Sequence, residues 1–241
     1  MNRDCTLFIV HIPKAAGTTF RWILDRQYPD WRVFKIGNRI PEERQRLEAM
    51  SDADKRNLLG VFGHMCYGWH TTMPPDRPVA YVTILREPVA RVVSLYHYIH
   101  LPDHYLGQVV KGMSLYHTVT SGVTCTMDNG MVRQLCGDDQ FLRKPYEDMV
   151  IPFGRVTREH LEKAKENLRH FDVVGTAGDF YGVLEQMRVK FGWRLLPFEN
   201  KNVTLWPQPG WTITQEGLDA ARDANLLDIE LFQWVKGGMR D

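Results

Sequence analysis

The chain has few cysteines, no excess of charge of one sign and no long hydrophobic run. Its four cysteines are scattered over 241 residues, which excludes a disulfide framework and predicts free thiols in a reducing compartment. Thirty basic residues against 29 acidic ones leave a formal charge of +1, which excludes general adhesion to nucleic acid or to an anionic membrane. Any anion-binding site must therefore be local.

The apolar segments are short. Residues 79–85 form the longest one near a predicted strand, far below the roughly 20 residues that span a bilayer. Residues 7–10 are too short for the apolar core of a secretory signal. We therefore expect no transmembrane segment and a cytoplasmic protein, unless the chain is a trimmed lumenal domain. The length and the 44% hydrophobic content predict a single domain over residues 1–241, without repeats or linkers.

Strand and helix patterns alternate along the chain. Apolar runs predict strands at 5–12, 33–36, 58–62, 79–85 and 171–175. Helical spacing and caps predict helices after Gly17, from Pro88, and over 41–53, 106–119, 129–135, 158–170, 179–191 and 214–235. A long loop is predicted at 196–210. This alternation is typical of a parallel sheet covered by helices on both faces.

The sharpest functional signal lies between the first strand and the first helix, where the sequence reads His11-Ile12-Pro13-Lys14-Ala15-Ala16-Gly17-Thr18-Thr19-Phe20. Amide groups at a helix N-terminus carry positive partial charge, small side chains let an anion approach them, and Lys14 adds a full charge. Lys14 precedes Gly17 instead of following it, so the order differs from the nucleoside triphosphatase loop. The alternative is an ordinary turn with a surface lysine.

A second signal follows the strand at 79–85. Arg86 comes directly after this strand, and Ser94 lies eight residues later in the next helix. Ligands of open α/β sheets collect at the carboxyl ends of the strands, so Arg86 and Lys14 could flank one crevice. The alternatives are an ion pair of Arg86 with Glu87 and a hydrogen bond from Ser94 to a helix carbonyl.

Together the two segments resemble those of the sulfotransferases that use 3′-phosphoadenosine-5′-phosphosulfate (PAPS), and among them the Golgi carbohydrate enzymes and their bacterial relatives. The resemblance implies an α/β fold, a P-loop-like three-layer sandwich with a central parallel sheet flanked by helices. It implies that the first segment binds the 5′-phosphosulfate and the second the 3′-phosphate. The implied binding residues are Lys14, Ala15, Ala16, Gly17, Thr18, Thr19, Arg86 and Ser94. Phe20 and Glu87 stand where the cytosolic branch tends to have Trp and where many members have Asp.

His64 lies between the two segments, after Gly63. The stretch resembles the Gly-His segment of the uronyl and heparan 2-O-sulfotransferases, where the histidine is the catalytic base. A hydroxyl must lose its proton as it attacks sulfur, and an imidazole suits this task. The resemblance, which spans residues 7 to about 190, implies His64 and Lys14 as catalytic residues and no metal. Asp25 is the rival base, unless it is a solvated surface carboxylate.

The predicted function is transfer of the sulfuryl group from PAPS to an acceptor hydroxyl. The resemblance favours a carbohydrate acceptor, and no nucleic-acid partner is expected. One alternative is a nucleotide-dependent kinase, opposed by the residue order of the loop and by the lack of an evident acidic pair for Mg²⁺. Another is a non-catalytic nucleotide-binding module of the same fold, which would need no general base.

Several side chains near these segments have two interpretations. His64, Cys66 and His70 are zinc-ligand types, but they lack paired ligand spacing, so no metal site is predicted. Tyr67, Trp69 and His70 either line an acceptor pocket or belong to the core.

Further along the chain lie His97, His100 and His104. These three histidines either contact the acceptor or form a solvated helix end, and we favour the second interpretation. Arg133 is a candidate for the acceptor or nucleotide side of the site. Lys201 and Asn202, in the predicted long loop, are candidates for closing over the nucleotide.

Overall fold

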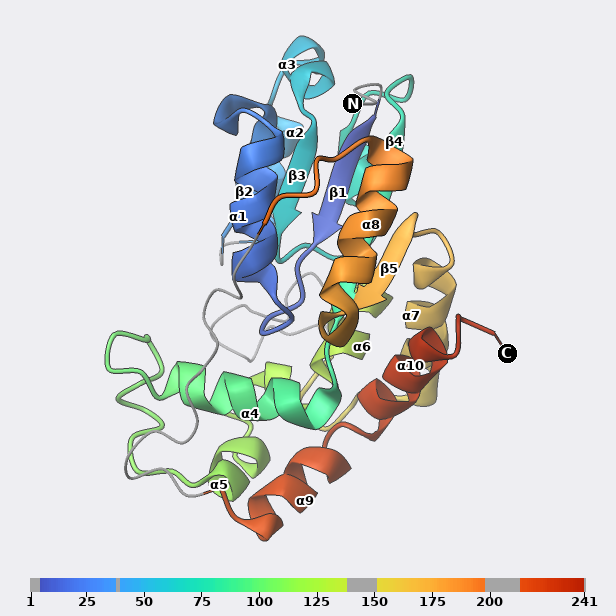
Figure 1. Ribbon diagram of the computed structural model, residues 1–241. Helices are drawn as coiled ribbons and strands as arrows, with labels where there is room; N and C mark the ends of the chain where they lie inside the picture. Colours follow the sequence, from blue (N-terminus) through green and yellow to red (C-terminus); the bar gives the residue numbers. More distant parts are fainter. Residues whose placement is uncertain (1–4, 38–39, 138–150, 198–212, 241) are drawn as a thin grey trace.

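One all-parallel, five-stranded sheet organises the computed structural model, which describes residues 5–37, 40–137, 151–197 and 213–240 (Figure 1). The strand order is β2-β3-β1-β4-β5. The strands are β1 (Thr6–Val10), β2 (Val33–Ile36), β3 (Gly60–Gly63), β4 (Val79–Leu85) and β5 (Val173–Thr176). The predicted parallel α/β sheet is confirmed, and β2 and β4 have the predicted bounds.

Helices pack on both faces of the sheet. On one face, α1 (Gly17–Gln27) and α8 (Phe180–Phe191) share a core with Leu7 and Ile9 of β1. On the other, Phe8 and Val10 share a core with the remaining covering helices, α2 (Ile40–Glu48), α6 (Gly130–Cys136), α7 (Arg158–Leu168) and α10 (Leu226–Lys236). Successive side chains of a strand point to opposite faces, so β1 is buried on both sides.

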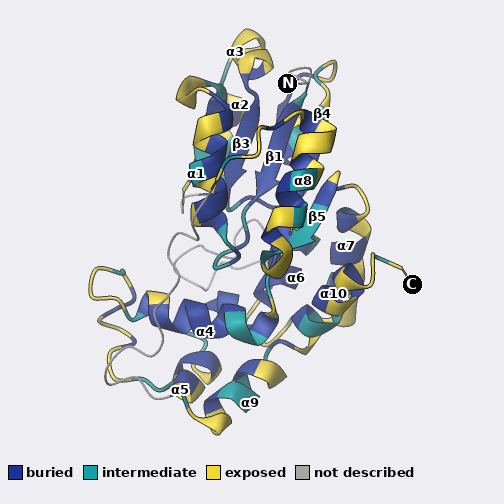
Figure 2. Cartoon of the chain, in the orientation of Figure 1, coloured by how far each residue is buried: buried dark blue, intermediate teal, exposed yellow. Residues whose placement is uncertain are grey.

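A third apolar core lies beyond the carboxyl ends of the strands. It joins α4 (Pro88–Ile99), α5 (Leu115–Thr120) and α9 (Gln215–Asp223). Figures 1 and 2 show the strands pointing toward α4, which is largely buried with α5 and α9 on its far side. The carboxyl edge of the sheet therefore faces a packed helical layer.

Two predicted helices are wrong in extent because serine side chains begin new helices. The helix predicted at 41–53 divides into α2 and α3 (Asp52–Asn57), since the Ser51 hydroxyl accepts a hydrogen bond from the Asp54 amide. Of the helix predicted at 106–119, only α5 is helical, and it begins after Ser114, whose hydroxyl accepts from the His117 amide. Turns occupy most of residues 101–112.

The helix predicted at 214–235 is also wrong, because it breaks at Asn225 into α9 and α10. The buried Asn225 amide donates to the carbonyls of Ala221 and Met127, and its oxygen accepts from the Asn129 amide. These bonds compete with continued helix. Nearly all of the predicted loop at 196–210 lies outside the described residues.

The cysteine prediction is confirmed, since all four cysteines are free thiols. None of the helices that the structure describes is long and apolar enough to cross a membrane.

Candidate active site

Three neighbouring strands end beside one another and carry the residues that the sequence singled out. In the order β3-β1-β4, the strands are followed by His64, by the loop from His11 to Ala16, and by Arg86. The chain leaves β1 toward β2 and β3 on one side, while β4 lies on the other, so β1 and β4 form the switch point where ligands of open sheets bind. Sheet topology thus brings His64, Lys14 and Arg86 to one edge.

The loop after β1 has the backbone conformation of an anion nest. Lys14 and Ala16 have positive φ angles of 69° and 61°, Ala15 between them does not, and α1 begins at Gly17. Alternating handedness turns successive amide groups toward the same side, which creates a concave, electropositive surface. Non-glycine residues with positive φ cost free energy and concentrate at functional sites.

The N-cap residue of α1, Ala16, has no side chain that can accept a hydrogen bond from the first turn. No side chain caps this helix, and its first turn has no acidic residue. By contrast, the Glu87 carboxylate caps α4 by accepting from the Val89 and Ala90 amides. The Asp228 carboxylate accepts hydrogen bonds from amides in the first turn of α6. The first amides of a helix have no carbonyl partner within it, and a helix N-terminus is a common place for an anion to bind.

Two cations border this loop. Arg86 Nη1 donates to the Lys14 carbonyl at 3.0 Å, and Lys14 Nζ lies 4.1 Å from the centroid of the Tyr98 ring. Among the residues that the structure describes, neither cation pairs with a carboxylate. Burial, with the nearby Arg86 charge, lowers the pKa of Lys14 to about 8. Burial lowers the pKa of Arg86, and the nearby Glu87 charge partly opposes this. Two adjacent cations that form no direct ion pair favour an anion.

The predicted alternative for Arg86, a direct ion pair with Glu87, is not formed: the Glu87 carboxylate caps α4, and its charge acts on Arg86 only from a longer distance. Ser94 lies in the same helix but is only 4% exposed, so it contributes little surface to a ligand. In the first turn of α1, Thr18 is exposed and Thr19 is buried, and Ala15 of the preceding loop is buried as well.

Two histidine rings stack at the strand ends. The rings of His11 and His64 lie 4.6 Å apart between centroids at 28°, and Phe62 stacks on His11. Gly17 allows this arrangement, because a Cβ there would lie 1.9 Å from the His11 ring. Gly63 has a φ of 152°, and a Cβ there would lie 2.3 Å from the Ile36 carbonyl oxygen. Gly17 therefore leaves room for the His11 ring, and Gly63 allows the end of β3 to pack closely against Ile36 of β2.

His64 is held in one tautomer. Its Nδ1 lies 2.9 Å from the His11 carbonyl oxygen, and a carbonyl can only accept, so Nδ1 carries the hydrogen in the neutral ring. Nε2 is then left with a lone pair, as a general base requires. Burial lowers the pKa of His64, and the bond to His11 partly opposes this. Burial, followed by the neighbouring His64 and Lys14, lowers the pKa of His11 well below its usual range.

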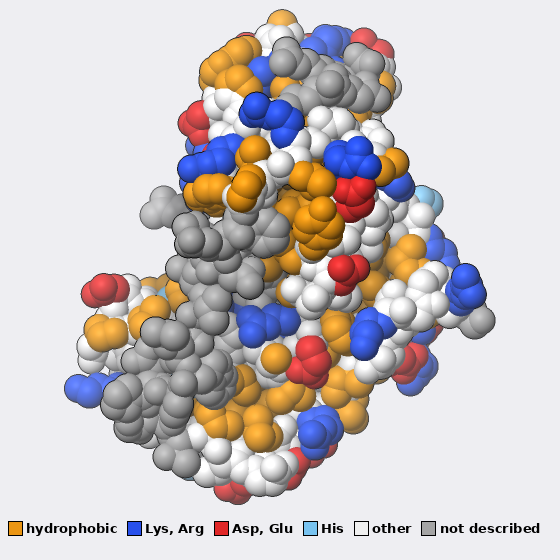
Figure 3. All heavy atoms as spheres, in the orientation of Figure 1, with side chains coloured by type: hydrophobic (Ala, Val, Ile, Leu, Met, Phe, Trp, Pro, Cys, Tyr) orange, Lys and Arg blue, Asp and Glu red, His pale blue; other side chains and the backbone are white. Residues whose placement is uncertain are grey.

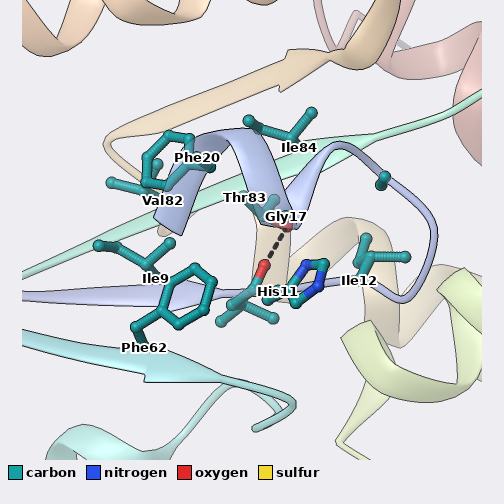
Figure 4. Close-up of a pocket in the computed structure, with 11 residues that line it drawn as sticks. Ile9, His11, Ile12, Gly17, Phe20, Phe62, Val82, Thr83 and Ile84 are labelled. Atoms are coloured by element: carbon teal, nitrogen blue, oxygen red, sulfur yellow. Dashed lines mark hydrogen bonds between the residues drawn. The ribbon is translucent and has the colours of Figure 1, made fainter. Parts of the chain in front are cut away.

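A small pocket lies beneath the loop, between the sheet and α1 (Figure 4). Its lining is mainly apolar, with His11, Gly17 and Thr83 at one side, and the Thr83 hydroxyl donates to the Val10 carbonyl at 2.9 Å. Lys14, Arg86 and His64 do not line it. It is a gap in the packing under the loop and is distinct from the edge where the cations lie.

Two predicted candidates are engaged elsewhere. Asp25 pairs with Lys35 of β2 at 2.9 Å and with Arg21 of its own helix, which favours the surface carboxylate over the rival base. Arg133 is fully buried and donates to the Asp128 carboxylate and to the carbonyls of Ile151 and Pro152. Its role is structural. Lys201 and Asn202 lie outside the described residues.

The histidines after the second segment do not form a solvated helix end, so that prediction is wrong. His97 is 2% exposed. The His100 ring contacts the carbonyl oxygens of Tyr96 and Met113 at 2.8 and 3.2 Å, and His104 Nδ1 accepts from the Leu106 amide. Local hydrogen bonds organise this part of the chain.

The aromatic candidates near His64 belong to the core or to a separate cluster. Trp69 is fully buried, as the core interpretation predicts. Tyr67 packs on Tyr81, Phe171 and His170, and the His70 ring contacts the Tyr81 hydroxyl at 3.0 Å. Among the described residues, no group of His, Cys, Asp or Glu is arranged to hold a metal ion.

The structure adds two side chains that the sequence did not single out. Tyr98, on α4, contacts Lys14, and Gln134, on α6, donates to the carbonyls of His11 and Met65. Gln134 lies more than a hundred residues from His11, and no periodicity or motif signals such a contact. The position of Tyr98 one turn after Ser94 offered a weak signal.

Figure 3 shows Lys or Arg side chains between the sheet and the α4 layer, with hydrophobic and acidic side chains close by. The cations of the site therefore lie on a surface of mixed charge, in a chain whose formal charge is +1.

No model of a known protein family matches this chain, and no curated protein sequence matches it significantly.

Proposed function

We propose that this protein is a PAPS-dependent sulfotransferase that transfers the sulfuryl group to a hydroxyl of an acceptor, with a carbohydrate as the favoured class. One observation carries the proposal: a nest-shaped loop, with an uncapped helix N-terminus and two cations lacking carboxylate partners, lies beside a histidine whose Nε2 can accept a proton. A simple nucleotide-binding module needs the anion site but not the base.

The residues present fit a doubly phosphorylated donor. The amides of Ala16 and Gly17 and the Lys14 ammonium suit its 5′-phosphosulfate, whereas the Ala15 amide already donates to the Ile12 carbonyl. Arg86 suits its 3′-phosphate, since a guanidinium keeps donors beyond the one given to the Lys14 carbonyl. The donor, when bound, supplies an activated sulfuryl group.

His64 and Lys14 have different roles in the proposed transfer. The acceptor oxygen forms a bond to sulfur while the bond from sulfur to the bridging phosphate oxygen breaks. His64 Nε2 takes the acceptor proton, and Lys14 stabilises the negative charge that develops on the bridging oxygen. Adenosine 3′,5′-bisphosphate is the leaving product.

Calorimetric titration with adenosine 3′,5′-bisphosphate, ADP and ATP tests the donor site. We expect the bisphosphate to bind most tightly, and Arg86→Ala to weaken it by about 10- to 100-fold, because a charge-assisted hydrogen bond contributes about 1.5–3 kcal/mol.

Arg77 provides a matched control, since it also donates to a backbone carbonyl, that of Leu58, but beside the amino ends of the strands. Arg77→Ala should leave nucleotide affinity unchanged. Equal or tighter binding of ATP would overturn the proposal and favour the kinase.

The pH dependence of kcat/KM should be bell-shaped. Activity should rise with pH as His64 loses its proton, at a pKa below the usual 6.5 of histidine, and fall as Lys14 loses its proton near pH 8. The measurement is kcat/KM between pH 5 and pH 10. Lys14→Arg should remove the alkaline limb, because arginine stays charged; an alkaline limb that persists in this variant belongs to another group.

A further inference from the structure

The Gln134 side chain donates to two backbone carbonyls next to His64, one on the loop after β1 and one on the residue that follows His64. Its Nε2 donates to the Met65 carbonyl at 2.8 Å and to the His11 carbonyl at 3.1 Å. The His11 carbonyl oxygen also accepts from His64 Nδ1. A carbonyl oxygen has two lone pairs, so these two donors saturate it.

The orientation of the Gln134 amide follows from its partners. Both neighbours are carbonyl oxygens, so only the NH₂ end can face them. The side chain is fully buried, and its Oε1 has no hydrogen-bond partner within the described part of the chain. An unsatisfied buried acceptor costs free energy, so the side chain is not optimised for stability alone.

The helix that carries Gln134 is itself anchored. The Met131 and Val132 amides at the start of α6 donate to the Asp228 carboxylate at 3.0 and 2.8 Å. The neighbouring Arg133 bonds the Asp128 carbonyl at 2.8 Å. Gln134 therefore extends from a rigid support to the ends of β1 and β3.

We propose that Gln134 is a positioning residue: by fixing the His11 carbonyl, it holds His64 in the Nδ1–H tautomer with Nε2 available as the base. This role rests on the proposed function, whereas the tautomer can be measured without catalysis. Without the Gln134 amide, the His11 carbonyl is no longer anchored to α6, and when its oxygen moves away from His64 Nδ1 the ring can exchange tautomers.

The test is Gln134→Met, which keeps the length of the side chain and removes its donors. Nitrogen-15 NMR of the imidazole rings should show His64 as Nδ1–H in the wild type and as a tautomer mixture in the variant. We expect kcat to fall about 10- to 100-fold, as for groups that orient a ligating histidine. Affinity for adenosine 3′,5′-bisphosphate should be unchanged.

Asn167 supplies the control, because its buried amide also donates to a backbone carbonyl, that of Leu135 at 2.7 Å, on the same helix. Asn167→Leu should lower the Tm comparably while leaving kcat and the His64 tautomer unchanged. An equal loss of kcat in both variants, or an unchanged His64 tautomer in Gln134→Met, would overturn the proposal.

Gln134→Glu keeps the inference testable if Gln134→Met does not fold. The carboxyl that Gln134→Glu introduces can donate one hydrogen bond when protonated and none when ionised. As pH rises, kcat of this variant should therefore begin to fall at a lower pH than kcat of the wild type. An unchanged alkaline limb counts against the positioning role. If the wild type transfers no sulfuryl group to any hydroxyl, the proposed function fails, yet the tautomer measurement still decides the role of Gln134.

Discussion

Substitution of His64 by asparagine should lower kcat by about 10²–10⁴-fold, the usual contribution of a general base. Asparagine can still donate from its amide to the His11 carbonyl, as His64 Nδ1 does at 2.9 Å, but it has no basic nitrogen. Nucleotide affinity should persist, because the proposed anion site uses Lys14 and Arg86 and not the imidazole ring. The rate is measured as release of adenosine 3′,5′-bisphosphate in the presence of a hydroxyl acceptor that the wild type sulfates. Calorimetric titration of the same variant measures its nucleotide affinity.

His70 is the matched control for this experiment. It lies in the same connection between β3 and β4, but its ring bonds the Tyr81 hydroxyl within the separate aromatic cluster. His70→Asn should leave kcat unchanged. If His64→Asn removes both turnover and nucleotide affinity, His64 is a structural residue of the loop and the base lies elsewhere.

Substitution of Lys14 by alanine should lower kcat by about 10²–10³-fold, by analogy with the loss of one oxyanion donor. Its charge lies beside the nest formed by residues 14–17, with Arg86 as a neighbouring cation. Lys14→Ala should also weaken binding of the bisphosphate, because it removes half of the cationic pair. Both quantities are accessible from steady-state rates and titration of the same preparations.

Lys35 is the control for Lys14→Ala. It is a lysine of β2 that pairs with Asp25 and Asp30, and Lys35→Ala should not change the rate. Lys14→Arg should retain more activity than Lys14→Ala, since it keeps the charge. Equal rates for wild type and Lys14→Ala would exclude Lys14 from stabilising the leaving oxygen.

The proximity of the candidate site residues could be predicted from local sequence. Lys14, His64 and Arg86 each follow an apolar strand, and parallel strands end at one edge, so their proximity was predictable. Hydrogen bonds join His64 to His11 and Arg86 to Lys14. Ser94 shows the limit of this reasoning. Its spacing from Arg86 does not indicate which neighbours cover it, and they leave it only 4% exposed.

The errors have a common physical origin in side chains that bond backbone. Ser51 and Ser114 begin helices inside segments whose apolar spacing predicts continuous or longer ones. Asn225 ends α9 through bonds to Met127 and Asn129, almost a hundred residues away. Apolar periodicity reports which face of a helix is buried and is insensitive to such polar competition.

The sequence by itself determined the parallel α/β sheet, because alternating apolar runs and amphipathic helices must bury their faces in this way. It also determined the edge at which Lys14, His64 and Arg86 lie. Only the tertiary structure decided that His64 carries its hydrogen on Nδ1 and that Gln134 bonds the His11 carbonyl. The tautomer and the buried bond depend on which donor meets which acceptor, and contacts between distant parts of the chain set these pairs.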